Sequence, residues 1–227
     1  MNTLAIDTAT NSLELALAKD DDILALYRGR TGTRTARVLH PILGVLLDGA
    51  GLAVDQLDLI VAIRGPGAFT GVRIGLAVAK TLSQVLGIPA IGIDTLQALA
   101  ARVAPSDGDR LYAAINTFGR ELYMQAFTGT ANGWNAAGPI EQRSFAELWR
   151  VAGSARVILR RVPQRAPVPI EPPAETRLVD AAVGEELAVD ALRLGRRILL
   201  SDPDAMMRYP PDPIYIKPEV RAPGLGS

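Results

Sequence analysis

Asp7, Thr8 and Thr10 are the residues of this chain best suited to chemistry, because they follow directly on a short apolar run at residues 3–6. A carboxylate and two hydroxyls in the turn after a strand are suited to holding a metal-bound phosphate. The turn contains no glycine, so it gives phosphate little access to backbone amides. A second phosphate turn would need an acid and glycines near Asn116, where the chain has an amide and one glycine. We therefore expect Asp7, Thr8 and Thr10 to form a degenerate phosphate-binding turn.

Several other kinds of chemistry are excluded by residue counts. The chain has no cysteine and one histidine, His40. Disulfides, thiolate metal sites, cysteine nucleophiles and mechanisms that need two histidines are therefore absent from it. A peptidase would need a nucleophile–base pair or a metal site, and neither is supplied. His40 precedes Pro41 in an apolar run and is interpreted as a structural residue. We expect no metal and no catalytic residue.

A glycine-rich turn at residues 64–75, Arg-Gly-Pro-Gly-Ala-Phe-Thr-Gly-Val-Arg-Ile-Gly, organises the first half of the chain. It lies between an apolar run of strand length, residues 58–63, and a proline-free stretch, residues 72–86, that predicts a helix. Thr70 is placed to cap that helix. The glycine spacing fits neither a dinucleotide fingerprint nor a P-loop. The turn alone therefore indicates anion binding only weakly, with Arg73 nearby.

The predicted helix carries small residues four apart, namely Gly71, Gly75, Ala79 and Ser83. Such a stripe lets another backbone approach closely. Two interpretations remain open. The stripe either docks a second helix, from this chain or another, or packs tightly against its own sheet.

The order of the predicted elements defines a fold. Three strands joined by tight turns are followed by a helix, a strand, a helix, a strand and a helix, at residues 3–6, 13–18, 23–27, 36–49, 58–63, 72–86, 89–93 and 95–103. A meander followed by right-handed crossovers gives a mixed five-stranded sheet covered by helices. This α/β arrangement is ribonuclease-H-like, and actin-like proteins carry it twice.

A polar break at residues 105–109 divides the chain into a first domain, 1–104, and a second domain, 105–227. The second begins with two paired strands, residues 111–115 and 121–127, then a loop at 128–138, a helix capped by Ser144 and a strand at 156–159. Residues 163–173 are rich in proline and predict no regular structure. A long helix at about 180–200 is expected to pack on the first domain. We interpret the second half as a smaller, degenerate copy of the first.

Charge gives the chain no overall field, because 24 basic residues balance 24 acidic ones. Two arginine clusters stand out: Arg28, Arg30, Arg34 and Arg37, and Arg156, Arg160, Arg161 and Arg165. Each is either a solvated face or a contact for RNA or an acidic partner. No signal peptide or apolar run of membrane length is evident, so we expect a cytoplasmic protein without membrane contact.

The opening Ala-Ile-Asp-Thr-Ala-Thr at residues 5–10, the turn at 64–75, and the stretch from Gly87-Ile88-Pro89 to Thr95-Leu96 together resemble the TsaB family. This glycoprotease-like family, also called YeaZ, takes part in threonylcarbamoyladenosine modification of tRNA. The resemblance covers residues 1 to about 104 and is thin beyond residue 105. The turn is shared mainly with the sister family TsaD. Where the family often has an aspartate, this chain has Asn116.

The resemblance implies a noncatalytic scaffold that activates a TsaD-like transferase and is joined by a TsaE-like ATPase. The tRNA is then engaged indirectly through the complex, at the adenine next to the anticodon, and the chain alone forms a homodimer. We expect the partner interface on the two helices at 36–49 and 72–86, at Val38, Ile42, Val45, Gly71, Arg73, Gly75, Ala79 and Ser83. No cofactor of its own is expected, although a nucleotide at the partner interface is compatible with the family. The alternatives are a self-contained actin-like ATP-binding hydrolase and an RNA-binding module.

Overall fold

The computed structural model describes the chain apart from residues 11, 117–120, 161–171, 182–185, 215 and 217–227. The first half forms a five-stranded sheet in the order β3-β2-β1-β4-β5. Strands β1, β2 and β3 are antiparallel to one another in turn, and β4 and β5 run parallel to β1. Their bounds are Asn2–Asp7, Leu13–Lys19, Asp22–Gly29, Leu59–Ile63 and Ala90–Ile93 for β1 to β5.

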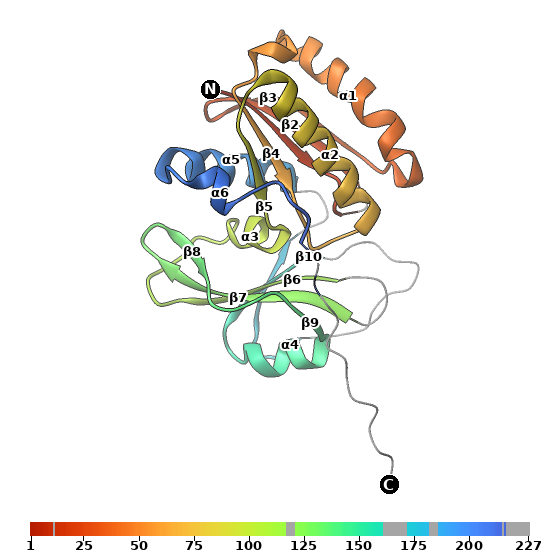
Figure 1. The fold of residues 1–227 in the computed structure, drawn as a ribbon. Coiled ribbons are helices and arrows are strands. Elements are labelled where there is room, and N and C mark those ends of the chain that lie inside the picture. The colour runs from red at the N-terminus through yellow and green to blue at the C-terminus, as the bar shows by residue number, and fades with distance from the viewer. Residues whose placement is uncertain (11, 117–120, 161–171, 182–185, 215, 217–227) are drawn as a thin grey trace.

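Helices cover both faces of this first sheet (Figure 1). Helices α1 (Thr35–Ala50) and α2 (Phe69–Leu86) lie side by side on one face. On β1, Ile6 faces α2, because a side chain added at Gly75 would contact it. Successive strand residues point to opposite faces, and Val61, which pairs with Ala5, meets Gly195 of α5 (Leu187–Ser201). Helix α5 therefore covers the other face.

The second half forms a second sheet in the order β11-β10-β6-β7-β8, with β9 also paired to β7. The order and directions repeat those of the first sheet, because β8, β7 and β6 are antiparallel in turn and β10 and β11 run parallel to β6. This repeat confirms the predicted ribonuclease-H-like and actin-like fold with a smaller second copy. The bounds are Arg110–Asn116, Glu121–Thr130, Gly133–Ala136, Glu141–Ser144, Arg156–Arg160 and Arg177–Ala181 for β6 to β11.

The apolar core continues between the two sheets. Helices α3 (Thr95–Ala100) and α5 lie between them, and one buried cluster joins the first sheet to residues of β6, β7 and β10 such as Phe127 and Ile158. Helix α4 (Phe145–Ala152) lies on the far side of the second sheet (Figure 1), and a second buried cluster joins it to that sheet. The remaining short helices are η1 (Gly32–Arg34), η2 (Val54–Gln56) and α6 (Ala205–Arg208). Layering of this kind places the end of β1 and the start of α5 at the boundary between the two halves.

Local signals fix several helix ends as expected. Ser144 caps α4 and forms a reciprocal capping box with Glu147. Helices α1 and α2 end at Gly51 and Gly87, whose φ angles of 66° and 68° lie in the left-handed region that glycine tolerates. The prediction that Thr70 caps α2 was wrong, because the helix begins at Phe69 after an extended Ala68 and has no side-chain cap.

Two further predictions for the second half were wrong in part. The loop expected at residues 128–138 contains the end of β7 and the short strand β8. The helix expected at 180–200 is present as α5 and packs on the first sheet, but it begins only at Leu187, and strand β11 ends where the helix was expected to start. The proline-rich segment 163–173 falls almost entirely outside the described residues. Among the helices that the structure describes, none combines the length and apolar character needed to span a bilayer.

Candidate functional site

The turn after β1 holds its polar side chains in two directions. Asp7 is fully buried, and its carboxylate accepts hydrogen bonds from the Ala9 amide at 2.7 Å and the Thr10 hydroxyl at 2.9 Å. Thr8 points the other way and donates its hydroxyl to the Gly71 carbonyl of α2 at 2.7 Å. Asp7 and Thr10 therefore share one site, whereas Thr8 fastens the turn to α2.

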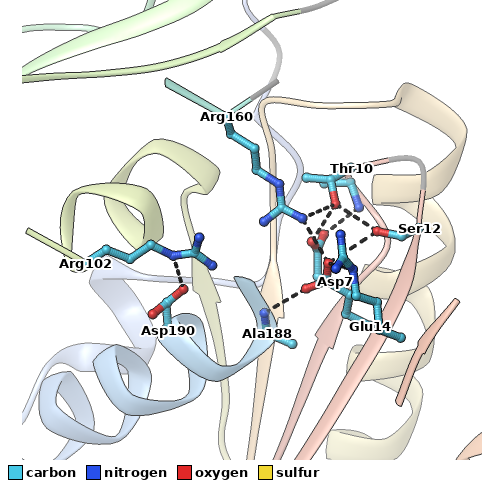
Figure 2. Close-up of polar contacts among 10 residues, drawn as sticks. Asp7, Thr10, Ser12, Glu14, Arg102, Arg160, Ala188 and Asp190 are labelled. Atoms are coloured by element: carbon cyan, nitrogen blue, oxygen red, sulfur yellow. Dashed lines mark hydrogen bonds and ion pairs between the residues drawn. The ribbon is translucent and has the colours of Figure 1, made fainter. Parts of the chain in front are cut away.

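Glu14 and Arg160 complete this site, and neither was among the predicted site residues. Glu14 lies opposite Asp7 on β2 and is fully buried. The Arg160 guanidinium, from the end of β10, lies 2.9 Å from the Glu14 carboxylate and donates to Thr10 at 3.3 Å (Figure 2). One signal was available in the sequence: Glu14 is the lone charge inside an apolar strand, and a buried charge needs a partner.

Two more groups satisfy the Glu14 carboxylate. The amide of Ala188, in the first turn of α5, donates to it at 3.3 Å (Figure 2). Arg28 of β3 lies 3.5 Å away. A carboxylate at a helix N-terminus is favoured by the aligned peptide dipoles. Glu14 thus occupies, as part of the chain, a position that would otherwise suit a bound anion.

Asp7 is the electrostatically strained member of the site. Burial, followed by the nearby Glu14 carboxylate, raises the pKa of Asp7 to about 6. The Arg160 guanidinium and the hydrogen bonds from Ala9 and Thr10 oppose that increase. A proton on Asp7 relieves the repulsion between the two buried carboxylates.

The arrangement leaves little room for nucleotide chemistry. A phosphate turn needs open backbone amides and a hydrated metal beside its acid. Here the Ala9 amide is taken by Asp7, and the cationic position beside the acids is taken by Arg160. Asn116 is buried at the end of β6, and the residues after it lie outside the described part. Within the part of the chain that the structure describes, no three acidic or histidine side chains gather as a metal site would require.

The glycine-rich turn at 64–75 has a packing role. A side chain at Gly67 would overlap the Ala9 carbonyl, and one at Gly71 would overlap the Thr8 carbonyl. The Ala68 amide donates to the Ala9 carbonyl at 2.7 Å. The glycines therefore let α2 begin in contact with the turn that carries Asp7.

The small-residue stripe of α2 faces inward, so its interpretation as an exposed docking ridge was wrong. Gly75 and Ala79 are buried, and a side chain at Gly75 would overlap the Thr8 hydroxyl. Ser83 is half-buried and donates its hydroxyl to the Ile88 carbonyl at 2.6 Å. The alternative interpretation, tight packing on the chain's own sheet, is the one that the geometry supports.

Comparisons with known proteins agree with this architecture. Residues 31–125 match the family model described as TsaD, tRNA N6-adenosine threonylcarbamoyltransferase. The tRNA threonylcarbamoyladenosine biosynthesis protein TsaB of Escherichia coli is 34% identical over 134 residues, which are 59% of this chain and 58% of that protein. TsaB of Bacillus subtilis is 38% identical over 48% of this chain and 47% of its own length. The matches thus span about half the length of these curated relatives.

A solved structure, YeaZ from Pseudomonas aeruginosa, extends the likeness to the whole fold. It superposes with a TM-score of 0.69 at 26% identity and covers 95% of this chain and 99% of that one. The chain is thus similar to TsaB proteins over about half its length and to YeaZ over nearly all of it. Glu14 and Arg160 fill the boundary site of this chain, and helices α1 and α2 lie within the region that matches the TsaD model.

The outer face of α1 and α2 is the part of the predicted interface that stays accessible. Val45 is 73% exposed, and a side chain at Gly44 would meet nothing within 4 Å. Arg73 is exposed with its guanidinium 3.9 Å from the centre of the Phe69 ring. The other two predicted interface residues on α1, Val38 and Ile42, are half-buried against the core.

The second arginine cluster is engaged inside the same chain wherever the structure describes it. Arg156 donates to the Asp109 carboxylate at 2.5 Å and lies 5.3 Å from the centre of the Trp134 ring. Arg160 belongs to the Glu14 site. Arg161 and Arg165 lie outside the described residues.

Proposed function

We propose that this chain is a noncatalytic scaffold subunit that pairs with a TsaD-like transferase in threonylcarbamoyl modification of the tRNA adenine next to the anticodon. The TsaB relatives carry the name of that pathway, and the family model that matches residues 31–125 is that of the transferase. A TsaE-like ATPase joins the pair, and the chain works in the cytoplasm. We also propose that the boundary between the two domains lies near residue 104.

The observation that carries the scaffold role is the contrast between a filled site and an open face. Glu14 and Arg160 occupy the position between the halves, which argues against a self-contained nucleotide hydrolase and against a cofactor of its own. The outer face of α1 and α2 instead offers Val45, exposed Val85 and the open surface at Gly44. Smooth, partly apolar helix faces suit helix-to-helix docking.

Size-exclusion chromatography of the mixed proteins tests the pairing. We expect the chain to co-elute with the TsaD-like protein of the same organism, and Val45→Arg to weaken the pair by about 30-fold or more, as loss of an interface anchor does. Val151→Arg is the matched control, because Val151 is exposed on α4, which lies beyond the second sheet. The same Val45→Arg change should reduce self-association of the chain alone.

Two outcomes would contradict this assignment. Failure of the unmodified chain to co-elute with its TsaD-like counterpart rejects the scaffold role. Co-elution of the Val45→Arg variant at full strength places the interface elsewhere on the molecule.

A further inference from the structure

We propose that the arginine-rich edge at the N-terminal ends of α1 and α2, called here the basic corner (Arg30, Arg34, Arg37 and Arg73), binds the RNA backbone directly beside a pocket for an unpaired base. This inference deepens the proposed function, since it makes the tRNA a direct ligand of this subunit. It rests on that function for the choice of tRNA as the RNA.

The positive charge of three arginines of the corner is uncompensated within the part of the chain that the structure describes. Arg30, Arg34 and Arg37 are exposed, and none has an ion-pair partner among the described residues. No acidic residue occurs between Asp22 and Asp48 in the sequence. Because the whole chain is neutral, this excess is local and would recruit a polyanion to this edge alone.

The Glu14 carboxylate, which contacts Arg28 on the neighbouring strand, does not neutralise these arginines. Glu14 is fully buried and is already held by Arg160 at 2.9 Å and Arg28 at 3.5 Å. Its charge is therefore engaged inside the fold and is not offered to the exposed arginines. Phosphate groups, which bring their own negative charge, fit such an edge better than neutral ligands do.

The fold brings these residues to one edge of the molecule. Gly29, at the end of β3, pairs with Leu13, at the start of β2, immediately after the turn that carries Asp7. The same turn is bonded to the first residues of α2 through the Ala68 amide and the Gly71 carbonyl. Helices α1 and α2 run side by side in the same direction, so both present their N-terminal ends here (Figure 1). Aligned helix dipoles add to the positive potential.

An aromatic feature beside the corner favours RNA over an acidic protein. Phe69 is 57% exposed, and Arg73 lies over its ring at 3.9 Å. Next to them is a pocket of about 280 Å³, lined by Phe69, Arg73 and Tyr123 among others. Unpaired bases stack on such rings and guanidinium planes. A protein interface would instead place an apolar centre among the charges, and Val45 and Val85 lie further along the helices.

Salt-dependent binding of an unmodified tRNA transcript tests the corner, both with the chain alone and with its TsaD-like partner bound. The triple variant Arg30→Gln, Arg34→Gln, Arg37→Gln should lower the slope of log affinity against log salt by about 2 to 3, as three lost phosphate contacts require. It should weaken binding by about tenfold or more in moderate salt. Phe69→Ser should weaken binding without changing the slope, because stacking releases no counterions.

The matched control removes three charges elsewhere, with Arg150→Gln, Arg193→Gln and Arg197→Gln, all of which are exposed. This control should keep the wild-type slope. Equal slopes for the two triple variants, or no measurable tRNA binding by the unmodified protein, overturn the inference. If the triple variant of the corner no longer binds the TsaD-like partner but still binds tRNA, the corner is a contact for an acidic protein. That result also overturns the inference.

The design separates this inference from the proposed function. A chain that pairs with its TsaD-like partner but shows no corner-dependent RNA binding contradicts the inference and leaves the scaffold role standing. Corner-dependent RNA binding without any pairing supports the inference and contradicts the scaffold role.

Discussion

Replacing Asp7 by asparagine would remove one of two buried carboxylates that lie beside a single buried guanidinium. Asparagine has the same shape, and its amide oxygen can still accept from the Ala9 amide. The side-chain amide can donate to Thr10 or toward Glu14. The substitution therefore isolates the effect of the charge while keeping the turn after β1 intact.

The expected magnitude follows from the pKa of Asp7, which burial and Glu14 raise from 3.8 to about 6. A raised pKa means that the folded protein binds this proton more tightly than the unfolded chain does. Below about pH 4 the buried position of Asp7 therefore does not lower the free energy of unfolding. As the pH rises toward 6, the free energy of unfolding falls progressively because the Asp7 carboxyl loses its proton. Above about pH 7 the full cost is reached, on the order of 3 kcal/mol of unfolding free energy.

The Asp7→Asn variant would avoid that cost, but its NH2 group cannot accept the hydrogen bond that the Thr10 hydroxyl donates to the carboxyl group, and rearranging this contact would cost about 1 kcal/mol at any pH. We expect the variant to be more stable than the wild type by about 1 to 2 kcal/mol at pH 8. At pH 4 the order should reverse. The two curves of stability against pH should therefore cross between about pH 4 and 7.

Urea unfolding followed by circular dichroism at several pH values measures this difference directly. Asp55→Asn is the control for removal of an exposed carboxylate, because Asp55 is exposed on η2. A difference between Asp7→Asn and the wild type that does not change with pH would refute the reasoning.

Three further perturbations separate the roles of other residues, each measured by the same unfolding assay. Arg160→Met should cost about 3 to 5 kcal/mol at pH 7.5, because it leaves buried carboxylates without their partner, and less at pH 5; a loss independent of pH would argue against that cause. Gly75→Ala should cost about 1 to 3 kcal/mol through overlap with Thr8, whereas Gly44→Ala on the open face of α1 should stabilise by about 0.5 to 1 kcal/mol; similar effects at both sites would contradict the assigned packing. Ser144→Ala should cost about 1 kcal/mol by removing the α4 cap, and no change would mean that the capping box contributes nothing.

The first half of the fold could be predicted well because its signals are local. Apolar runs separated by tight turns predicted β1 to β5, and the glycine-rich turn predicted the start of α2 to within a few residues. The second half was harder. Strand β8 lies in a polar stretch with glycine and asparagine, so no alternation of apolar residues identified it. Strand β11 is short and has charged residues at two of its positions, Arg177 and Asp180, so it lacks a continuous apolar run.

The candidate site was only half predictable for a different reason. Asp7 and Thr10 stand close together in the sequence, but Arg160 and Ala188 reach Glu14 from residues far along the chain. A single sequence contains no signal for such a pairing. The stripe of Gly75 and Ala79 fits a neighbouring helix or the chain's own strand equally well, and only the fold decides between them.

The placement of α5 has a consequence for synthesis on the ribosome. Strands β1, β2 and β4 emerge early, yet the helix that covers one of their faces is among the last segments translated. The Arg196 guanidinium, which binds the Asp21 carboxylate at 2.7 Å, and the Ala188 amide arrive with it. Closing contacts across such separations is slow, and the uncovered apolar face is open to aggregation meanwhile. The nascent chain should therefore need chaperone protection until translation has passed residue 201, and a ribosome-bound fragment ending at residue 180 should remain sensitive to protease.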